Sequence, residues 1–197
     1  MKKTNRLPAV TLLSIASAAL VAMAGPACAQ SAAKLVPAQS EIVFVSKQMG
    51  VPVEGKFKKF DAQVSLDPKQ PEGGKVALTI DVGSASLGVP ETDAELPRAP
   101  WFNAARFPQA SFQSSAIKSL GNGKFEVKGM LNIKGNAREL VVPVTLTQQG
   151  AASTATGSFT IKRLEFKIGE GEWADTSMVA NDVQVKFKLA LTGIAPL

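Results

Sequence analysis

Apolar and polar side chains alternate with a period of two through most of this chain. The pattern is clearest near the C-terminus, where every second residue from Val183 to Leu191 is apolar and the residues between include Gln184 and Lys186. Because successive side chains of a β-strand point to opposite faces, this alternation predicts a strand with one buried face and one wet face. The same template predicts seven further strands, which are Ile42–Phe44, Phe60–Leu66, Val76–Val82, Ala110–Ile117, Phe125–Ile133, Val142–Leu146 and Gly157–Phe166.

Short, turn-forming segments separate most of these strands. Gly121-Asn122-Gly123 and Lys134-Gly135-Asn136 are two examples, and gaps of this length predict antiparallel hairpins. A long exposed sheet edge promotes aggregation, and closure into a barrel removes the edges. The predicted fold class is therefore all-β, an eight-stranded antiparallel barrel. The interior of a barrel of this size either packs its own side chains or holds one small ligand.

The segment Ser84–Pro108 interrupts the pattern. It contains four of the twelve prolines of the chain, so it cannot form a continuous strand and predicts a short helical insertion instead. Trp101, Phe102 and Phe107 cluster in this insertion. Two interpretations stay open for these aromatic residues: a plug over one end of the barrel, or a gate for a ligand.

The N-terminus has the pattern of a secretory signal at residues 1–29. Lys2, Lys3 and Arg6 precede an uncharged stretch, and Ala27-Cys28-Ala29 provides small residues for cleavage. We expect a cleaved signal peptide, a single barrel domain at residues 30–197 and a periplasmic location. Removal of the three basic signal residues lowers the formal charge from +6 to +3, which is too mild to indicate a nucleic-acid partner.

The composition excludes most familiar catalytic sites. The chain has no histidine, and its one cysteine, Cys28, lies in the predicted signal peptide. A Ser-His-Asp triad, a cysteine protease dyad and a zinc site of the usual His/Cys type are thereby excluded from the predicted domain. Carboxylate-only hydrolysis stays open, with Glu95 and Glu172 as acids to test, but the favoured prediction is a protein that is not an enzyme.

Four segments resemble the YceI-like family of secreted lipid-binding proteins. They are SEIVFVSKQMGVPVEGKFKKFDAQVSLDP from Ser40, ETDAELPRAPWFNAARFPQASFQS from Glu91, KFEVKGMLNIKGNARELVVPV from Lys124 and IKRLEFKIGEGEWADTSMVANDVQVKFKL from Ile161. The resemblance covers roughly Lys34–Leu191. Two positions depart from it, because relatives often carry histidine where Gln48 and Glu95 stand, and this leaves the preference for a ligand headgroup open.

The resemblance implies a lipocalin-like barrel whose apolar cavity holds a polyisoprenoid lipid, either an isoprenoid quinone such as ubiquinone or a polyprenyl phosphate. It implies no catalytic residue, metal or catalytic cofactor. We expect the lipid to contact inward-facing and insertion residues, namely Phe44, Met49, Leu66, Leu78, Ile80, Trp101, Phe102, Phe107, Phe112, Leu131, Ile133, Leu146, Phe159 and Phe187. For each residue taken alone, ordinary core packing is the competing interpretation.

Besides a hydrolase, the sequence leaves two classes of protein open. The favoured prediction is a periplasmic carrier that encloses a long-chain polyisoprenoid. The alternative is an interaction protein with a filled core, which docks on a membrane electron-transfer partner such as a b-type cytochrome. A hollow barrel lined by apolar side chains would favour the carrier. The sequence leaves the oligomeric state open, a homodimer included.

Overall fold

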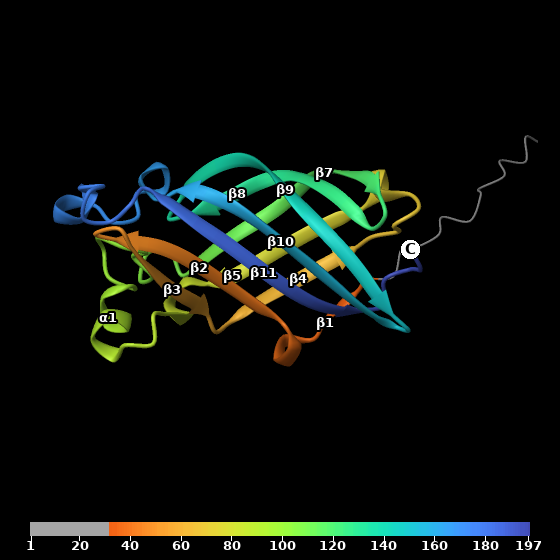
Figure 1. Ribbon diagram of the computed structural model, residues 1–197, viewed down its shortest axis with the longest axis horizontal. Coiled ribbons are helices and arrows are strands. Elements are labelled where there is room, and N and C mark those ends of the chain that lie inside the picture. Colours follow the sequence, from red (N-terminus) through yellow and green to blue (C-terminus); the bar gives the residue numbers. More distant parts are fainter. Residues whose placement is uncertain (1–31) are drawn as a thin grey trace, which may run out of the picture.

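The computed structural model describes residues 32–197, and the predicted signal peptide at residues 1–29 lies outside the described residues. Within the described part, one antiparallel sheet of eleven strands curls into a barrel (Figure 1). The strands are β1 (Lys34–Leu35), β2 (Glu41–Gln48), β3 (Val51–Phe57), β4 (Phe60–Ser65), β5 (Lys75–Asp81), β6 (Ala85–Ser86), β7 (Gln109–Gly121), β8 (Lys124–Ile133), β9 (Asn136–Gln149), β10 (Ala152–Lys162) and β11 (Asp182–Thr192).

Helices are short and lie between the strands. The helix α1 (Pro90–Glu95) forms in the proline-rich insertion, as predicted. Five single turns of 3-10 helix are η1 (Pro37–Gln39), η2 (Pro71–Gly73), η3 (Val82–Ser84), η4 (Arg163–Phe166) and η5 (Gly171–Ala174). Among residues 32–197, no helix is long and apolar enough to cross a membrane.

The predicted all-β barrel is confirmed, but the predicted strand number of eight is wrong. All eight predicted strands are present, although the one predicted at Gly157–Phe166 ends at Lys162, where η4 begins, and the three further strands are β1, β3 and β6. Strands β1 and β6 have two residues each, too few to show a period. In β3, Pro52 and Gly55 interrupt the alternation. The proline is tolerated because β6 pairs only with Lys56 and Phe57, so the edge of β3 beside Pro52 needs no amide donor.

A short N-terminal segment closes the barrel. The hydrogen-bonded path runs β4-β5-β7-β8-β9-β10-β11-β2-β3-β6, which leaves β4 at one end. Lys34 of β1 pairs with Thr192 of β11, and Ala33 forms a bridge with Val64 of β4. Ala33 and Lys34 therefore join β4 to β11, and this connection covers the sheet edge at β4.

A bulge in β7 changes which of its side chains face inward. The register of β7 against β8 shifts between Ser114 and Ala116. As a result both Phe112 and Ile117 are buried, although one position is even and the other odd. An extra residue of this kind bends the strand and increases its twist, which helps a sheet to curl.

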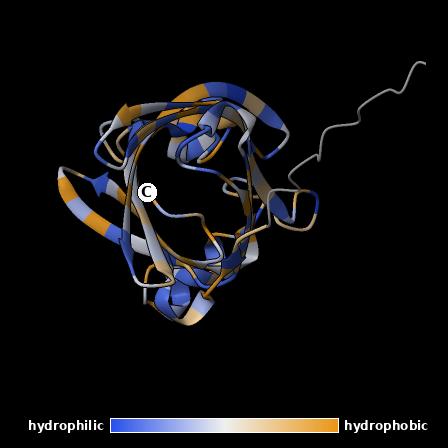
Figure 2. Ribbon diagram, turned by 90° about the vertical axis from the view of Figure 1, so that its right-hand side faces the viewer, coloured by the Kyte–Doolittle hydropathy of each residue, from blue (hydrophilic) through white to orange (hydrophobic). Residues whose placement is uncertain are grey.

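The two ends of the barrel differ in how they are covered. The insertion Leu87–Pro108, with α1, and the loop Arg163–Asn181 lie at the same end, on the left of Figure 1, and we call these two segments together the cover. The turn between β7 and β8 and the C-terminus lie at the opposite end. Seen from that side, the strands form a ring and the segment Gly193–Leu197, hereafter the C-terminal segment, crosses in front of it (Figure 2).

Candidate functional site: two joined apolar cavities

One cavity occupies the barrel on the side of the C-terminal segment, and we call it the tail-end cavity. Its volume is about 120 Å³, and every residue around it is apolar. Apolar cavities of about 150 Å³ stay dry and accept small hydrocarbons, so this cavity is of a useful size for part of an apolar ligand. Its lining is Ile42, Val64, Leu66, Val76, Leu78, Ile80, Phe112, Ile117, Phe125, Val127, Leu131, Val142, Val144, Leu146, Ala155, Phe159, Val185, Phe187, Leu189, Leu191 and Ile194.

A second cavity lies beneath the cover, and we call it the cover-end cavity. Its volume is about 110 Å³, and Ser46 and Arg163 are the polar residues of its lining. The apolar residues around it are Phe44, Phe57, Ile80, Leu96, Trp101, Phe102, Ala110, Leu131, Ile133, Phe159, Ile161, Ile168, Val179, Val183 and Val185. The aromatic rings form a chain on one side of this cavity, with Phe57 5.2 Å from Phe44 and 5.9 Å from Phe102 between ring centroids.

Four residues belong to both cavities. They are Ile80, Leu131, Phe159 and Val185, contributed by β5, β8, β10 and β11. These four side chains lie between the two cavities and form a waist, so the cavities adjoin inside the barrel, and we call the two together the tunnel. Two adjoining apolar cavities suit an extended apolar ligand.

Twelve of the fourteen residues expected to contact a lipid lie around these cavities. Leu66, Leu78, Phe112, Leu146 and Phe187 line the tail-end cavity. The cover-end cavity includes Phe44, Trp101, Phe102 and Ile133, and the waist includes Ile80, Leu131 and Phe159. The strand residues were identified by the period of two. Their contact with a ligand stays a prediction.

Met49 and Phe107 line neither cavity. Met49 has φ 47° in the two-residue turn between β2 and β3 and is 73% exposed, because this turn lies beyond the end of the barrel. Phe107 instead packs on Gly135, where an added Cβ would lie 3.0 Å from its Cε1, and the Arg106 guanidinium lies 5.3 Å from the centre of its ring. Both residues lie outside the alternating segments, so their positions in the sequence did not indicate whether they face the tunnel.

Arg163 is the lining residue whose role the sequence did not reveal. It is 1% exposed, yet it makes no ion pair with Glu165 or Asp175, the acidic residues near it in sequence, and Glu165 pairs with Arg138 instead. All five donors of its guanidinium are used on backbone oxygens at 2.6–3.1 Å, those of Ile168, Gly169, Trp173, Val179 and Ala180. Burial lowers the pKa of Arg163 from its ordinary value. The side chain therefore organises the loop Arg163–Asn181 around a buried positive charge.

The two halves of the cover are bound to each other. Backbone amides of Gly169 and Glu170 both donate to the oxygen of Pro100, at 2.8 and 2.9 Å. The rings of Trp101 and Trp173 lie 5.4 Å apart, at an interplanar angle of 44°. These contacts hold the insertion and the loop together over the cover-end cavity.

A buried lysine connects the cover to the barrel. Lys134 lies in the turn between β8 and β9, and its Nζ donates to the backbone oxygens of Ala99 and Lys167 and to Glu170 Oε2, at 2.7–2.8 Å. Its side chain is 5% exposed. One ammonium group thus binds both halves of the cover, and charge-assisted hydrogen bonds of this kind are stronger than neutral ones.

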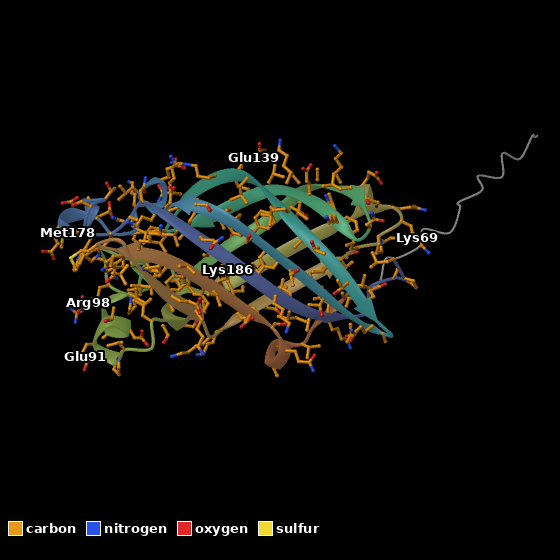
Figure 3. All side chains as sticks on the ribbon, in the orientation of Figure 1. Lys69, Glu91, Arg98, Glu139, Met178 and Lys186 are labelled. Carbon is orange, nitrogen blue, oxygen red and sulfur yellow. The ribbon has the colours of Figure 1, made fainter. Side chains whose placement is uncertain are left out.

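Weaker contacts hold the C-terminal segment at the opposite end of the barrel. The amide of Gln148 donates to the oxygen of Ala195 at 2.9 Å and accepts from the amide of Leu197 at 2.8 Å. Ile194 of the same segment lines the tail-end cavity, and Leu197 is 47% exposed. In Figure 3, Met178 is labelled at the cover end of the barrel and Lys69 at the opposite end. Neutral hydrogen bonds contribute only about 1 kcal/mol each, so these contacts are weaker than the charge-assisted bonds of the cover.

Three acidic residues of the cover, Asp93, Glu95 and Asp175, make contacts with residues near them in sequence. Asp93 accepts from Ser86 Oγ at 2.6 Å and from the amide of Leu87, and these bonds lower its pKa. Glu95 pairs with Arg98 at 3.1 Å. Hydrogen bonds to the hydroxyl and amide of Ser177 lower the pKa of Asp175 in the same way. Among the described residues, no group of three or more His, Cys, Asp and Glu side chains could hold a metal ion.

Known proteins resemble this chain over nearly all of the barrel. The family model of the YceI-like domain matches residues 34–191. A UPF0312 protein of Vibrio cholerae is 26% identical over 187 residues, covering 88% of this chain and 98% of that protein. The YceI protein of Salmonella arizonae is 34% identical over 96 residues, which is 49% of this chain and 50% of that protein.

Solved structures share the same barrel. The crystal structure of BcnA from Burkholderia cenocepacia has a TM-score of 0.78 and 48% identity, covering 80% of this chain and 99% of that one. A domain from Saccharophagus degradans, described as a polyisoprenoid binding domain implicated in plant cell wall breakdown, has a TM-score of 0.67 and 16% identity, covering 83% and 98%. At that identity the second likeness concerns the fold alone.

Proposed function

This chain belongs to the YceI-like family, and from that premise we propose that it is a binding protein that encloses the tail of a polyisoprenoid lipid in its tunnel. The observation that carries the proposal is the pair of adjoining cavities, lined almost entirely by apolar side chains. A filled core, as an interaction protein would have, leaves no such tunnel. The polyisoprenoid-binding domain from Saccharophagus degradans supports the ligand class through its shared fold.

Hydrophobic enclosure is sufficient for affinity. Burying one CH₂ group contributes about 0.8 kcal/mol, so a five-carbon isoprene unit contributes roughly 4 kcal/mol before the costs of association. The tail of a membrane lipid is already dry, however, and its transfer into the tunnel is therefore nearly balanced. This balance suits a carrier that loads and unloads rather than one that retains its lipid.

We propose an isoprenoid quinone or a polyprenyl phosphate as the lipid and the periplasm as the compartment. The compartment rests on the signal pattern at residues 1–29. The choice of headgroup rests on the chemistry of the two lipid classes, which share a methyl-branched tail of repeating units. The tunnel contacts the tail, so both classes fit the same lining.

The test is native mass spectrometry of the mature protein purified from its own periplasm, followed by extraction and identification of bound lipid. The apoprotein is then offered ubiquinone and a polyprenyl phosphate. We expect a stoichiometric complex with one of them. A bare protein that takes up neither lipid would contradict the proposal and favour an interaction protein that docks on a membrane partner such as a b-type cytochrome.

Two neighbouring residues of β8 offer a matched pair of variants. Leu131 lies at the waist, whereas Met130 points outward and is 45% exposed. Leu131→Gln places a polar amide in the tunnel, where it finds no partner, and we expect at least a tenfold loss of lipid affinity. Met130→Gln adds the same group on the wet face and should leave lipid binding unchanged. Circular dichroism verifies that both variants are folded.

A further inference from the structure

Three glycines of the barrel wall each lie beneath the ring of a phenylalanine from an adjacent strand. Phe44 of β2 is paired with Gly55 of β3, and Phe187 of β11 is paired with Gly157 of β10. The ring of Phe112 of β7 reaches over Gly129 of β8. The three phenylalanines line the tunnel, Phe44 at the cover end and the other two at the tail end.

The distances show how closely each ring approaches its glycine. A Cβ added at Gly55 would lie 2.6 Å from Phe44 Cε2, with Phe44 Cζ closer still. A Cβ at Gly129 would lie 2.5 Å from Phe112 Cζ, and one at Gly157 would lie 2.5 Å from Phe187 Cζ. Real Cβ atoms do not approach other atoms so closely. The far edge of each ring therefore rests on the wall in space that only glycine leaves free.

The position of the rings explains why this barrel is hollow. Side chains on a strand stand roughly perpendicular to the sheet, so an inward phenylalanine normally points toward the barrel axis. The interior of a barrel of about eight strands is just wide enough for such side chains to fill it. Here three of the largest inward side chains lie along the wall instead, and the space at the axis stays open.

We propose that Gly55, Gly129 and Gly157 set the bore of the tunnel, and thereby select for a methyl-branched polyisoprenoid tail over a thinner straight chain. This inference rests on the proposed function for the identity of the ligand, but its structural part concerns the protein alone. Any side chain at these positions displaces the phenylalanine ring toward the axis and narrows the tunnel there.

Gly55 is the position at which this can be tested cleanly. The three atoms nearest to an added Cβ at Gly55 all belong to side chains, those of Phe44 and Leu87. At Gly129 and Gly157 the added Cβ would also meet a backbone oxygen, that of Gln113 or Pro143. Substitutions at those two positions would therefore distort the sheet itself, whereas Gly55→Ala requires only that two side chains move.

The experiment compares the mature wild-type protein with Gly55→Ala, using solanesol as the branched probe and 1-hexadecanol as the straight one. We expect the affinity for solanesol to fall at least tenfold and the ratio of the two affinities to change at least fivefold toward hexadecanol. The double variant Gly55→Ala/Phe44→Leu should restore solanesol binding, because the shorter side chain vacates the bore. Gly83→Ala, on η3 outside both cavities, is the matched control.

A crystal structure of Gly55→Ala supplies a readout that needs no ligand. A Phe44 ring turned toward the axis, with a smaller cover-end cavity, supports the inference, whereas an unmoved ring overturns it. Wild-type protein that binds neither probe would contradict the proposed function alone. If Gly55→Ala does not fold, the variant Phe44→Leu is tested in its place. The inference then predicts a wider bore and a changed ratio of the affinities for solanesol and hexadecanol. An unchanged ratio overturns the inference.

Discussion

The guanidinium of Arg163 donates to the backbone oxygen of Trp173 at 2.6 Å, the shortest of five bonds by which one buried side chain shapes the loop Arg163–Asn181. Arg163 thereby positions Trp173 against Trp101 and brings Ile168 and Val179 to the cover-end cavity. The charge has no acidic partner among these contacts. Its stabilisation depends on the carbonyl dipoles, which are correctly placed only when the loop is folded.

Replacement of Arg163 should therefore release the cover. Arg163→Met leaves several buried carbonyl oxygens unpaired, and we expect a loss of about 3–5 kcal/mol in the free energy of unfolding. Denaturant unfolding measures the loss, and hydrogen exchange should show it concentrated in residues 163–181. Arg138→Met is the control, because Arg138 is half exposed and its pair with Glu165, at 3.7 Å, contributes little. Equal losses in the two variants would contradict the role assigned to Arg163.

The waist between the cavities should limit the length of tail that the tunnel accepts. Phe159→Ala removes the largest waist side chain and joins the cavities more widely, at a cost of about 3 kcal/mol in stability. We expect the preference among polyprenols of increasing length to shift toward longer chains. Phe60→Ala truncates a partly buried phenylalanine that lines neither cavity and should leave the preference unchanged. A preference for length that does not change in Phe159→Ala would show that the waist is not limiting.

The C-terminal segment should govern the rate at which a ligand leaves. Gln148→Ala removes both side-chain hydrogen bonds that hold Ala195 and Leu197, so the segment should detach from the tail end of the barrel. We expect dissociation of a bound polyprenol to accelerate by up to about thirtyfold in stopped-flow measurements, since two neutral hydrogen bonds contribute about 1 kcal/mol each and about 1.4 kcal/mol corresponds to a factor of ten. Gln149→Ala, at the exposed neighbouring position, is the control. Dissociation at the wild-type rate in Gln148→Ala would indicate exit elsewhere.

The attachment of α1 should weaken in acid. Hydrogen bonds from Ser86 and from the amide of Leu87 lower the pKa of Asp93 below its ordinary value of 3.8. A group whose pKa is lower in the folded state stabilises that state above the unfolded pKa, and this contribution disappears as the pH falls through the folded pKa. We expect acid denaturation curves of wild-type protein and Asp93→Asn to differ at neutral pH and to converge below pH 3.8. Parallel curves throughout would contradict the assignment.

Sequence periodicity located the walls of the tunnel well but could not show its ends. Val183–Leu191 and the other alternating segments are strands in which alternate residues face inward, because a period of two is a local property of extended backbone. Ile168, Val179 and Ile194 line the cavities from irregular segments, where no period exists. In β7, the bulge near Ser115 shifts the inward set in a way that no simple alternation predicts.

The sequence by itself determined eight of the strands, the inward faces of the regular ones, the helical insertion and the family, since each depends on neighbouring residues or on motifs in order along the chain. Tertiary structure alone decided closure through Ala33 and β1, the five carbonyls around Arg163, and the placing of the Phe44, Phe112 and Phe187 rings on wall glycines beside the hollow. Each of these depends on residues from different strands or loops meeting in space. A cavity in particular is a small difference between the volume that a wall encloses and the volume that its side chains fill, and only their actual directions determine it.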